Sequence, residues 1–219
     1  MPALLFDLDG TMLNSDAIHR EVFVELLGPR GFEVDEAFYM AHIHGRLNVD
    51  IFADLIPDEP DPQGLSDAKE AAFRDRLPRP YPAMPGVVGT VRDAQAKGWP
   101  MAVVTNAMRL NAEAMLEAIG LRDAFDTIVV GEECARAKPD PEPYRTAMDL
   151  LGVAPDDAIA FEDSPSGIRA AAASGAVTIG VRSGLTDRDL RAAGADATIQ
   201  DFTDPALPGL LTRLKGDAA

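Results

Sequence analysis

Two carboxylates, Asp7 and Asp9, stand at the end of a short apolar run near the start of the chain and are followed by Gly10 and Thr11. The run over residues 3–6 has the composition of a buried strand, and charged groups are seldom buried unless they have a partner or a chemical task. Two neighbouring carboxylates at the tip of a core strand need a counter-charge, which a bound cation can supply. The pattern therefore indicates a cation site.

Polar side chains follow three other apolar runs in the same way. They are Thr105 with Asn106, then Lys138, then Glu162 with Asp163. Ligands of a doubly wound sheet bind beyond the carboxyl ends of its strands, so we expect all four sites to meet at one edge. Their chemistry is complementary, because carboxylates suit a metal, a hydroxyl and an amide suit oxyanions, and an ammonium neutralises anionic charge.

The elements that must position these side chains alternate from about residue 85 onward. Strands are predicted over residues 101–104, 127–130, 158–161, 177–181 and 197–199, with amphipathic helices after the first three. Gly120 closes the first helix, Asp140 is expected to cap the second and Ser164 the third, each of the last two with a proline in its first turn. This rhythm predicts an α/β fold, a doubly wound, mostly parallel sheet with helices on both faces.

A long insert separates the first strand from the second. A parallel crossover needs only about a dozen residues, whereas residues 14–82 are too many for a crossover and too patterned for a bare loop. Ser15 is expected to cap a helix with Ile18, Val22 and Leu26 on one face, and further helical stretches cover 36–43, 48–56 and 66–77. We predict an α-helical cap domain over 14–82, inserted into a core domain of 1–13 and 83–219, with linkers that let the cap close over a substrate.

The four sites together resemble the motifs of a known superfamily. In chain order they read Asp7-Leu-Asp9-Gly10-Thr11, Thr105-Asn106, Lys138-Pro139-Asp140-Pro141 and Glu162-Asp163-Ser164-Pro165-Ser166-Gly167. They resemble the four motifs of the haloacid dehalogenase (HAD) superfamily, and the insert resembles the cap of the branch that holds phosphoglycolate phosphatase, sugar phosphatases and β-phosphoglucomutase. The resemblance covers essentially the whole chain and implies a Rossmann-like core, a helical cap and Mg²⁺-dependent phosphoryl transfer.

The chemistry of phosphoryl transfer fits these residues. Asp7 is suited to attack phosphorus and form an aspartyl-phosphate, which splits a difficult displacement into two steps. Asp9 would protonate the leaving alcohol and then deprotonate the attacking water. Thr105, Asn106 and Lys138 would bind the transferring phosphoryl group and neutralise its charge. Dehalogenases and phosphonatases of the superfamily lack the second aspartate, so Asp9 favours phosphoryl transfer.

The predicted cofactor is Mg²⁺, which prefers a few carboxylates together with water and substrate oxygens. The resemblance implies that it binds Asp7, Asp163 and the backbone carbonyl of Asp9, with Glu162 coordinating directly or through water.

Composition restricts the partners. The 219 residues include 36 acidic and 20 basic ones, a net charge of −16, which argues against nucleic acid or an anionic membrane surface as partner. No apolar run approaches the ~20 residues that span a bilayer, the first strand leaves no room for a signal peptide, and the single Cys134 permits no intrachain disulfide. We expect a cytoplasmic monomer or weak homodimer whose partner is a small phosphorylated metabolite.

Three residues of the insert are candidates for substrate specificity. His19 lies ten residues after Asp9, where relatives often have a histidine that touches substrate, although it could equally be a packed helix residue. Gly45 and Arg46 occur where relatives place a cap loop that enters the active site, and Arg46 either grips a second anionic group or is a solvated arginine.

The sequence therefore predicts a Mg²⁺-dependent phosphatase that hydrolyses a sugar phosphate or a phosphoglycolate-type ester. The first alternative is a β-phosphoglucomutase-like phosphomutase. Against it, the mutase has arginine where Asn48 stands, in its Gly-x-x-Arg loop, and lacks the pair Thr105-Asn106. The second alternative is a non-catalytic protein that binds phosphorylated metabolites, which the filled catalytic positions disfavour.

Overall fold

The computed structural model describes residues 1–43 and 46–212, and the chain forms two compact units. The core unit comprises Met1–Asn14 and the chain from Arg79 onward, and the helical unit comprises Ser15–Pro78. These limits lie one and four residues from the predicted boundaries after residues 13 and 82. That the units behave as separate domains, and that one covers the other as a cap, stays a prediction.

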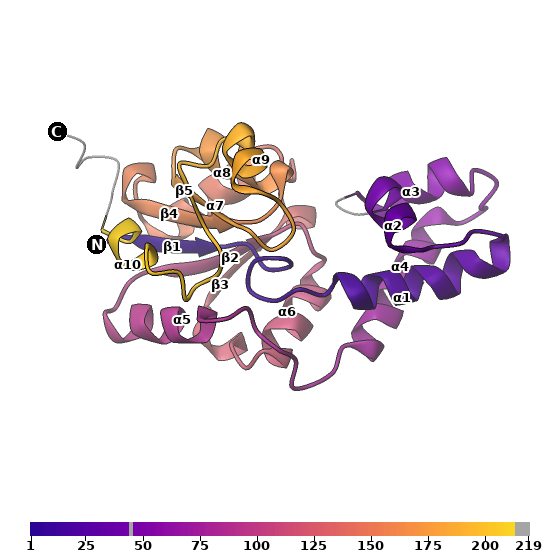
Figure 1. Cartoon of the computed structure of the whole chain (residues 1–219), viewed down its shortest axis with the longest axis horizontal. Coiled ribbons are helices and arrows are strands. Elements are labelled where there is room, and N and C mark those ends of the chain that lie inside the picture. Colours follow the sequence, from indigo (N-terminus) through magenta and orange to yellow (C-terminus); the bar gives the residue numbers. More distant parts are fainter. Residues whose placement is uncertain (44–45, 213–219) are drawn as a thin grey trace. The chain divides into compact units, whose positions relative to one another are not determined.

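The core unit contains the predicted parallel sheet, with six strands in the described part of the chain (Figure 1). The strands are β1 (Ala3–Phe6), β2 (Met101–Thr105), β3 (Thr127–Val130), β4 (Ala158–Glu162), β5 (Val177–Val181) and β6 (Ala197–Ile199). Their order is β3-β2-β1-β4-β5-β6, and every neighbouring pair is parallel. The order reverses beside β1, which therefore lies at the topological switch point where such sheets bind ligands.

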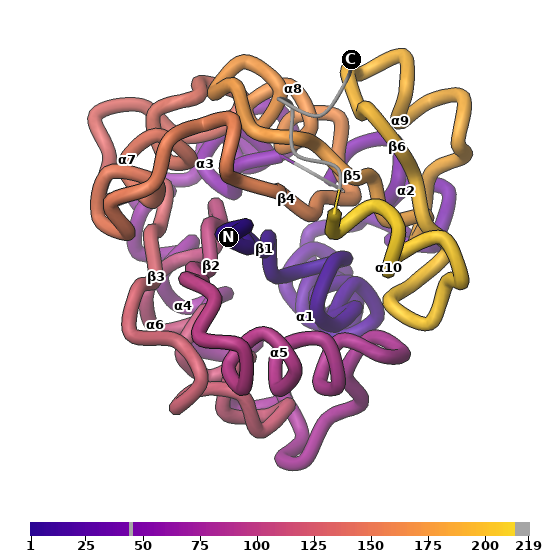
Figure 2. The backbone as a smooth tube through the Cα atoms, turned by 90° about the vertical axis from the view of Figure 1, so that its left-hand side faces the viewer, coloured from indigo at the N-terminus to yellow at the C-terminus, as the bar shows by residue number. Residues whose placement is uncertain are grey.

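Helices cover both faces of this sheet, as predicted. Figures 1 and 2 show α5 (Val87–Ala96) and α6 (Arg109–Ala118) on one face, with α7 (Glu142–Leu151) and α8 (Pro165–Ser174) on the other. The chain also forms α9 (Asp187–Ala193), α10 (Leu207–Leu210) and four single turns of 3₁₀ helix at Gly28–Arg30, Arg122–Ala124, Gly131–Glu133 and Pro155–Asp157. The sequence patterns above do not predict α5, α9 or α10. Helix α5 follows Gly86, which has no side chain to cap it, and contains Gly89. Helices α9 and α10 are only seven and four residues long.

Two of the three expected helix caps differ from the prediction. Ser164 caps α8 as expected, since its Oγ accepts a hydrogen bond from the Gly167 N–H at 3.0 Å. Asp140 instead accepts from the Glu142 N–H at 3.0 Å, and Pro141 occupies the N-cap position of α7. Ser15 precedes α1 without a side-chain cap bond, because its ψ of 6° departs from the extended backbone that a capping residue usually adopts.

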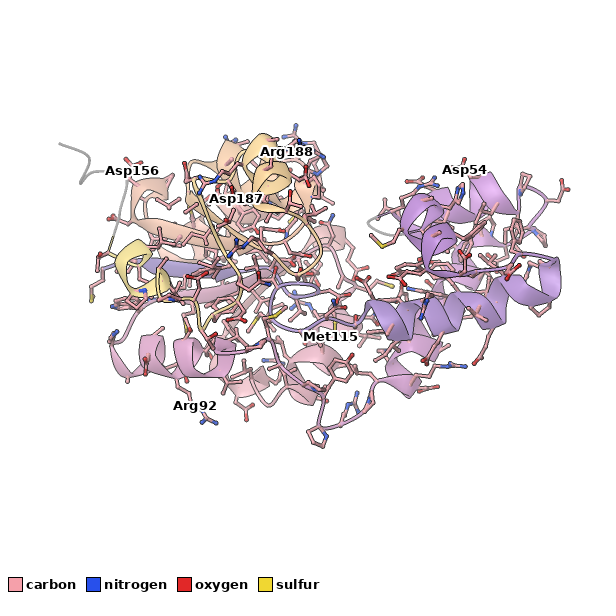
Figure 3. The ribbon with its side chains drawn as sticks, viewed as in Figure 1. Asp54, Arg92, Met115, Asp156, Asp187 and Arg188 are labelled. Atoms are coloured by element: carbon pink, nitrogen blue, oxygen red, sulfur yellow. The ribbon has the colours of Figure 1, made fainter. Side chains whose placement is uncertain are left out.

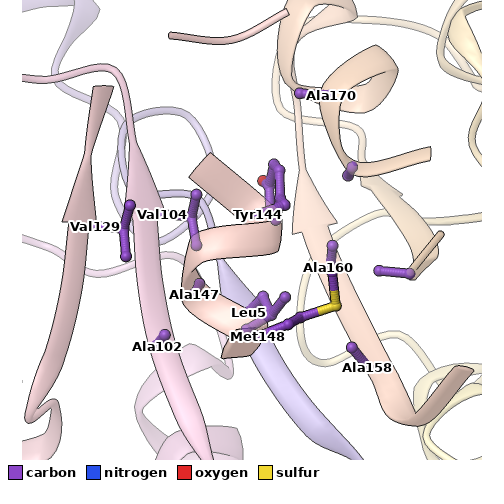
Figure 4. Packing of buried hydrophobic residues seen from close by; sticks show 12 residues of the cluster. Leu5, Ala102, Val104, Val129, Tyr144, Ala147, Met148, Ala158, Ala160 and Ala170 are labelled. Atoms are coloured by element: carbon purple, nitrogen blue, oxygen red, sulfur yellow. The ribbon is translucent and has the colours of Figure 1, made fainter. Parts of the chain in front are cut away.

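The core is built so that α7 can approach the sheet closely. Figure 4 shows Leu5, Val104 and Ala160 of neighbouring strands beside Ala147 and Met148 of α7, all of them buried. Small alanines at the contact let helix and strand backbones come near while keeping the interior densely packed. The strands are thereby held in a fixed register, and the residues that follow them are held at the same edge.

The outer surface of the core unit carries scattered charges. Arg92, Asp156 and Arg188 project outward from it (Figure 3) and are exposed. Within residues 1–43 and 46–212, no helix combines the length and apolar character needed to cross a membrane.

The helical unit consists of α1 (Asp16–Leu27), α2 (Glu36–His42), α3 (Asn48–Leu55) and α4 (Pro62–Arg76). The four predicted helical stretches are confirmed, but α4 begins four residues earlier than expected. Asp61 caps it by accepting from the Gly64 N–H at 2.9 Å, and Pro62 stands at the first helical position. The apolar faces meet in a cluster that contains Phe23, Leu27, Val34, Tyr39, Ile43, Ile51 and Phe52.

A polar cluster lies inside the helical unit. The Lys69 Nζ donates to Glu70 Oε1 at 2.8 Å and lies 2.7 Å from His19 Nδ1, and the His19 ring stacks on Phe73 with a centroid separation of 4.0 Å. The Asn48 amide donates to the same Glu70 oxygen at 2.6 Å. Burial alone would raise the pKa of Glu70, but Lys69 and His19 outweigh it, so the pKa lies below its ordinary value.

We therefore expect Glu70→Gln to destabilise the protein in a pH-dependent way. A carboxylate whose pKa is lowered on folding stabilises the native state above its unfolded pKa, and this contribution is lost as the pH falls through the lowered folded pKa. At pH 7 the substitution removes the negative charge beside the buried Lys69 ammonium and should cost about 3 kcal/mol. The difference from wild type should shrink below about pH 4. Urea unfolding of the wild type and the variant, at pH 7 and at a pH below about 4, measures this difference in the free energy of unfolding.

Asp67→Asn is the matched control, because Asp67 lies on the exposed face of the same helix. It should change the free energy of unfolding by no more than about 0.5 kcal/mol. A cost for Glu70→Gln that is equally large at both pH values would contradict the assigned role of the carboxylate.

Candidate active site

The structure brings the predicted carboxylates and the lysine together at the carboxyl edge of the sheet. Asp7 follows β1, Glu162 ends β4, Asp163 comes next, and Lys138 lies in the loop between β3 and α7. One carboxylate oxygen from each of Asp7, Glu162 and Asp163 lies within 4.8 Å of the others. The convergence expected from the strand ends is therefore present.

A tight turn directly after β1 holds Asp7 and Asp9, the two aspartates of the first motif. The Asp7 N–H donates to the Phe161 carbonyl at 2.9 Å, which continues the ladder between β1 and β4. The Gly10 N–H then donates to the Leu13 carbonyl at 2.7 Å and folds the chain back on itself. Asp9 thus stays close enough for its charge to contribute to the raised pKa values of Asp7 and Asp163.

Lys138 is buried at the centre of the site. Its Nζ donates to Asp7 Oδ1 at 2.7 Å, to Glu162 Oε1 at 2.6 Å and to the Val104 carbonyl at 2.7 Å. An ammonium has three N–H donors, so all three are in use and the position of the nitrogen is defined. Burial alone would lower the pKa of Lys138, but Asp7 and Glu162 outweigh it and raise the pKa, which keeps the ammonium charged.

Asn106 fastens the loop that carries Lys138. Its Nδ2 donates to the Lys138 carbonyl and its Oδ1 accepts from the Lys138 N–H, both at 3.1 Å. Thr105, which is buried, accepts from the Ala107 N–H at 3.1 Å through its Oγ1. Of the three residues predicted to bind phosphate, Lys138 contacts the nucleophile candidate, and Asn106 holds the backbone of Lys138.

Glu162 is fully buried and accepts hydrogen bonds at both oxygens. Oε1 receives Lys138 and the Tyr144 hydroxyl at 2.8 Å, and Oε2 receives the N–H groups of Asp163 and Ser164 at 3.2 and 3.4 Å. A Cβ on Gly167 would lie 1.8 Å from Oε1, so only glycine leaves room for the carboxylate. Glu162 is thereby fixed by the first turn of α8.

Asp163 is held from two other segments. Thr11 Oγ1 donates to its Oδ1 at 3.3 Å, and Ser183 Oγ, just after β5, donates to its Oδ2 at 3.1 Å. Gly10 has a φ of +83°, and a Cβ there would come within 2.0 Å of Asp163 Oδ2. The glycine of the first motif is required both by its backbone conformation and by the closeness of this carboxylate.

The electrostatics of the site favour a bound cation. Burial and the Glu162 carboxylate raise the pKa of Asp7 to about 7 against the opposing effect of Lys138, and burial with Asp7 raises the pKa of Asp163 well above its ordinary value. Lys138 pairs with Asp7 and Glu162, while Asp9 and Asp163 add further negative charge beside them. Oxygen donors with an excess of negative charge are the ligand set of a hard divalent cation, so the residues present fit Mg²⁺.

The specificity candidates belong to the helical unit. His19 packs on Phe73 and lies next to Lys69, as described above. The Arg46 guanidinium bonds to the His42 carbonyl at 3.0 Å, to the Asp50 carbonyl at 3.3 Å and to the Asp54 carboxylate. Gly45 lies outside the described residues. The predicted roles of His19, Gly45 and Arg46 toward a substrate stay predictions.

Sequence reasoning missed two side chains that hold the site. Tyr144 lies on the inward face of the helix predicted after residues 127–130, and its spacing in the sequence carries no sign of a polar contact. Ser183 is absent from the prediction although it follows a strand closely, as the predicted site residues do. The rule that polar residues beyond strand ends converge could have identified Ser183, whereas only coordinates reveal the contact of Tyr144.

The parallel sheet, the carboxylates at its edge and the helical insert after β1 define a hydrolase of the haloacid dehalogenase type. The sequence model of the haloacid dehalogenase-like hydrolase family matches residues 4–181, and the chain belongs to this family.

Among its relatives is validoxylamine A 7'-phosphate phosphatase of Streptomyces hygroscopicus subsp. limoneus, 33% identical over 207 residues that cover 93% of this chain and 95% of the relative. Fructose-1-phosphate phosphatase YqaB of Escherichia coli (strain K12) is 33% identical over 182 residues, which cover 82% of this chain and 95% of that relative. A crystal structure of a CbbY mutant from Rhodobacter sphaeroides in complex with xylulose-(1,5)bisphosphate superimposes with a TM-score of 0.81 at 29% identity. The match covers 92% of this chain and 95% of the CbbY chain.

Gly167→Ala tests the positioning of Glu162. The added methyl group would overlap the carboxylate, and a displacement of about 1 Å at a reacting site can cost about 100-fold in rate. We expect a folded protein whose hydrolysis of a simple aryl phosphate falls by about that factor.

Gly89→Ala is the matched control, because Gly89 is also helical and nothing lies within 4 Å of its added Cβ. It should keep full activity and gain up to about 1 kcal/mol of stability from its better helix propensity. Equal activities of the two variants would show that the close approach at Gly167 does not matter.

Proposed function

We propose that this protein is a Mg²⁺-dependent phosphatase that hydrolyses a small phosphorylated metabolite through an aspartyl-phosphate on Asp7. The observation that carries the proposal is the buried Lys138 ammonium, 2.7 Å from Asp7 Oδ1 and 2.6 Å from Glu162 Oε1, within a carboxylate cluster at the sheet edge. Membership of the haloacid dehalogenase-like family and the named phosphatases among the relatives support it.

Asp7 and Lys138 form the reacting pair. The Asp7 carboxylate attacks phosphorus and displaces the alcohol. A bond forms between the Asp7 oxygen and phosphorus, and the ester bond between phosphorus and the alcohol oxygen breaks. The ammonium beside it neutralises charge that develops on the phosphoryl oxygens. Because Lys138 is already fixed by three acceptors, this stabilisation needs little reorganisation.

Asp9 is the proposed general acid and base. It gives a proton to the departing alkoxide in the first step and takes one from the water that hydrolyses the aspartyl-phosphate in the second. The turn after β1 keeps Asp9 close to Asp7, and its charge adds to the effects of burial and Glu162, which raise the pKa of Asp7.

Asp7, Glu162 and Asp163 are the side chains that would hold Mg²⁺, together with the backbone carbonyl of Asp9. The ion supplies charge neutralisation that lets an anionic substrate approach an anionic nucleophile. The protein's part is to keep the ligands in place, which it does through the Thr11 and Ser183 bonds to Asp163 and the backbone bonds to Glu162.

We propose a sugar phosphate or a phosphoglycolate-type ester as substrate, with His19 as a specificity residue. The relatives named for a validoxylamine phosphate and for fructose 1-phosphate support the class. Arg46 already binds two carbonyls and a carboxylate of its own unit, which supports a structural role for it. A cytoplasmic location and a monomer or weak homodimer remain predictions from the sequence.

The polar cluster of the helical unit favours hydrolysis over isomerisation. Asn48 occupies the place of the mutase arginine, and its amide donates to Glu70 and Ser66 at 2.6 and 3.0 Å. A neutral side chain that is engaged in this way offers no cation for the second phosphate of a bisphosphorylated sugar.

Asp7→Asn tests the nucleophile. An amide cannot form the acyl-phosphate, so phosphate release should fall by about 1,000-fold or more while the fold is retained. The measurement is Mg²⁺-dependent phosphate release from a panel of sugar phosphates, phosphoglycolate and nucleotides, each with and without chelator. Appreciable turnover by a clean preparation of the variant would contradict the mechanism.

The same panel separates the alternatives. Release of phosphate from one class of ester, abolished by chelator, supports the phosphatase and identifies its substrate class. Conversion of one sugar phosphate into an isomer upon addition of a bisphosphate would favour the phosphomutase. Tight binding of an ester without any release would favour the non-catalytic protein.

A further inference from the structure

Tyr144 is the largest fully buried side chain of the core unit and has a polar contact that its packing does not require. Its ring projects from α7 over the strands that carry Val104 and Ala160 (Figure 4). Its hydroxyl donates to Glu162 Oε1 at 2.8 Å, and the Lys138 Nζ lies 5.0 Å from the centre of its ring. The Tyr144 side chain therefore contacts both Glu162 and Lys138.

The hydroxyl shares one oxygen atom with the lysine. Glu162 Oε1 accepts from Lys138 Nζ at 2.6 Å and from Tyr144 at 2.8 Å, while Lys138 divides its three donors among Glu162, Asp7 and the Val104 carbonyl. Because the donors on Oε1 compete for the same electron density, the tyrosine limits how strongly this oxygen attracts the ammonium. A donor on Oε1 can therefore influence how the ammonium is shared between Glu162 and Asp7.

We propose that Tyr144 is a positioning residue for phosphoryl transfer, whose hydroxyl bond to Glu162 Oε1 moderates the attraction of that oxygen for the Lys138 ammonium and so keeps the ammonium bonded to Asp7. The inference rests on the phosphatase function proposed above. Tyr144 acts through Glu162 and Lys138, and it is not assigned any contact with the substrate.

The placement of the hydroxyl supports a role beyond packing. A phenol oxygen inside an apolar cluster costs free energy unless it is hydrogen-bonded, and phenylalanine would fill the same space without this cost. The buried Tyr144 hydroxyl meets this requirement through its bond to Glu162 Oε1 at 2.8 Å.

Tyr144→Phe tests the proposal, because it removes the hydroxyl and keeps the ring and its contact with Lys138. Without the competing donor, Glu162 Oε1 attracts the ammonium more strongly and draws it away from Asp7. We expect kcat for an aryl phosphate at saturating Mg²⁺ to fall about tenfold, as for the loss of one hydrogen bond to a charged group. The KM should change by less than about twofold, since the ammonium is needed most where charge develops in the transition state.

Tyr39→Phe is the matched control. Tyr39 is also a buried tyrosine whose hydroxyl donates to a carboxylate, Asp16 Oδ1 at 3.0 Å, but it belongs to the helical unit. Both variants should unfold cooperatively with similar losses of stability, and Tyr39→Phe should keep the wild-type kcat. Equal kcat values for wild type and Tyr144→Phe, or equal losses in the two variants, would overturn the proposal.

A double-mutant cycle with Glu162→Gln tests whether the hydroxyl acts through the carboxylate. If it does, Tyr144→Phe should lower kcat by less than about twofold in the Glu162→Gln background, because the charged acceptor is already lost. An undiminished tenfold effect in that background would contradict the assigned route.

Failure of this inference can be told apart from failure of the proposed function. A wild-type protein that releases no phosphate from any ester contradicts the phosphatase function and removes the basis of the inference with it. An active wild type whose kcat is unaffected by Tyr144→Phe contradicts the inference alone.

Discussion

The ion pair of Lys138 with Asp7 and Glu162 is the interaction on which the rest of the site depends. A buried ammonium needs an opposite charge and a bond for each of its protons, and the structure supplies two carboxylates and the Val104 carbonyl at 2.6–2.7 Å. Such a pair contributes little net stability once the cost of desolvation is counted. Its contribution is geometric, because three acceptors fix one nitrogen beside the proposed nucleophile.

The partners of this nitrogen come from segments far apart in the chain, and the parallel sheet brings them together. Asp7 follows β1, the Val104 carbonyl belongs to β2 and Glu162 ends β4, which are adjacent strands in the order β2-β1-β4. Lys138 comes from the loop between β3 and α7, and Asn106, just after β2, binds the backbone of Lys138. A shift of one strand would break several of these bonds at once, so the buried packing of strands and helices maintains the chemistry at their ends.

Much of this arrangement could be predicted from the sequence, because it follows from periodicity and from the rule about strand ends. The five apolar runs from residue 101 onward all form strands, and Asp7, Lys138, Glu162 and Asp163 converge as expected. The short helix α9 and the start of α4 depend on local capping by Thr186 and Asp61 and lack a long periodic pattern. The contact of Tyr144 with Glu162 could not be predicted, since a tyrosine on an inward face has the same spacing whether or not its hydroxyl has a partner.

The glycines show how closely the charges of the site are packed. Gly10 and Gly167 leave room for Asp163 and Glu162, where a Cβ would come within 2.0 and 1.8 Å of a carboxylate oxygen. One carboxylate oxygen from each of Asp7, Glu162 and Asp163 lies within 4.8 Å of the others, and burial together with the repulsion between these groups raises the pKa values of Asp7 and Asp163. The net charge of −16 also disfavours an anionic substrate at long range. Affinity for a phosphate ester must therefore arise from positive charge within a few ångströms, which Lys138 supplies and a cation held by the carboxylates would increase. This explains why so many residues serve to hold the ammonium and a set of oxygen ligands in place.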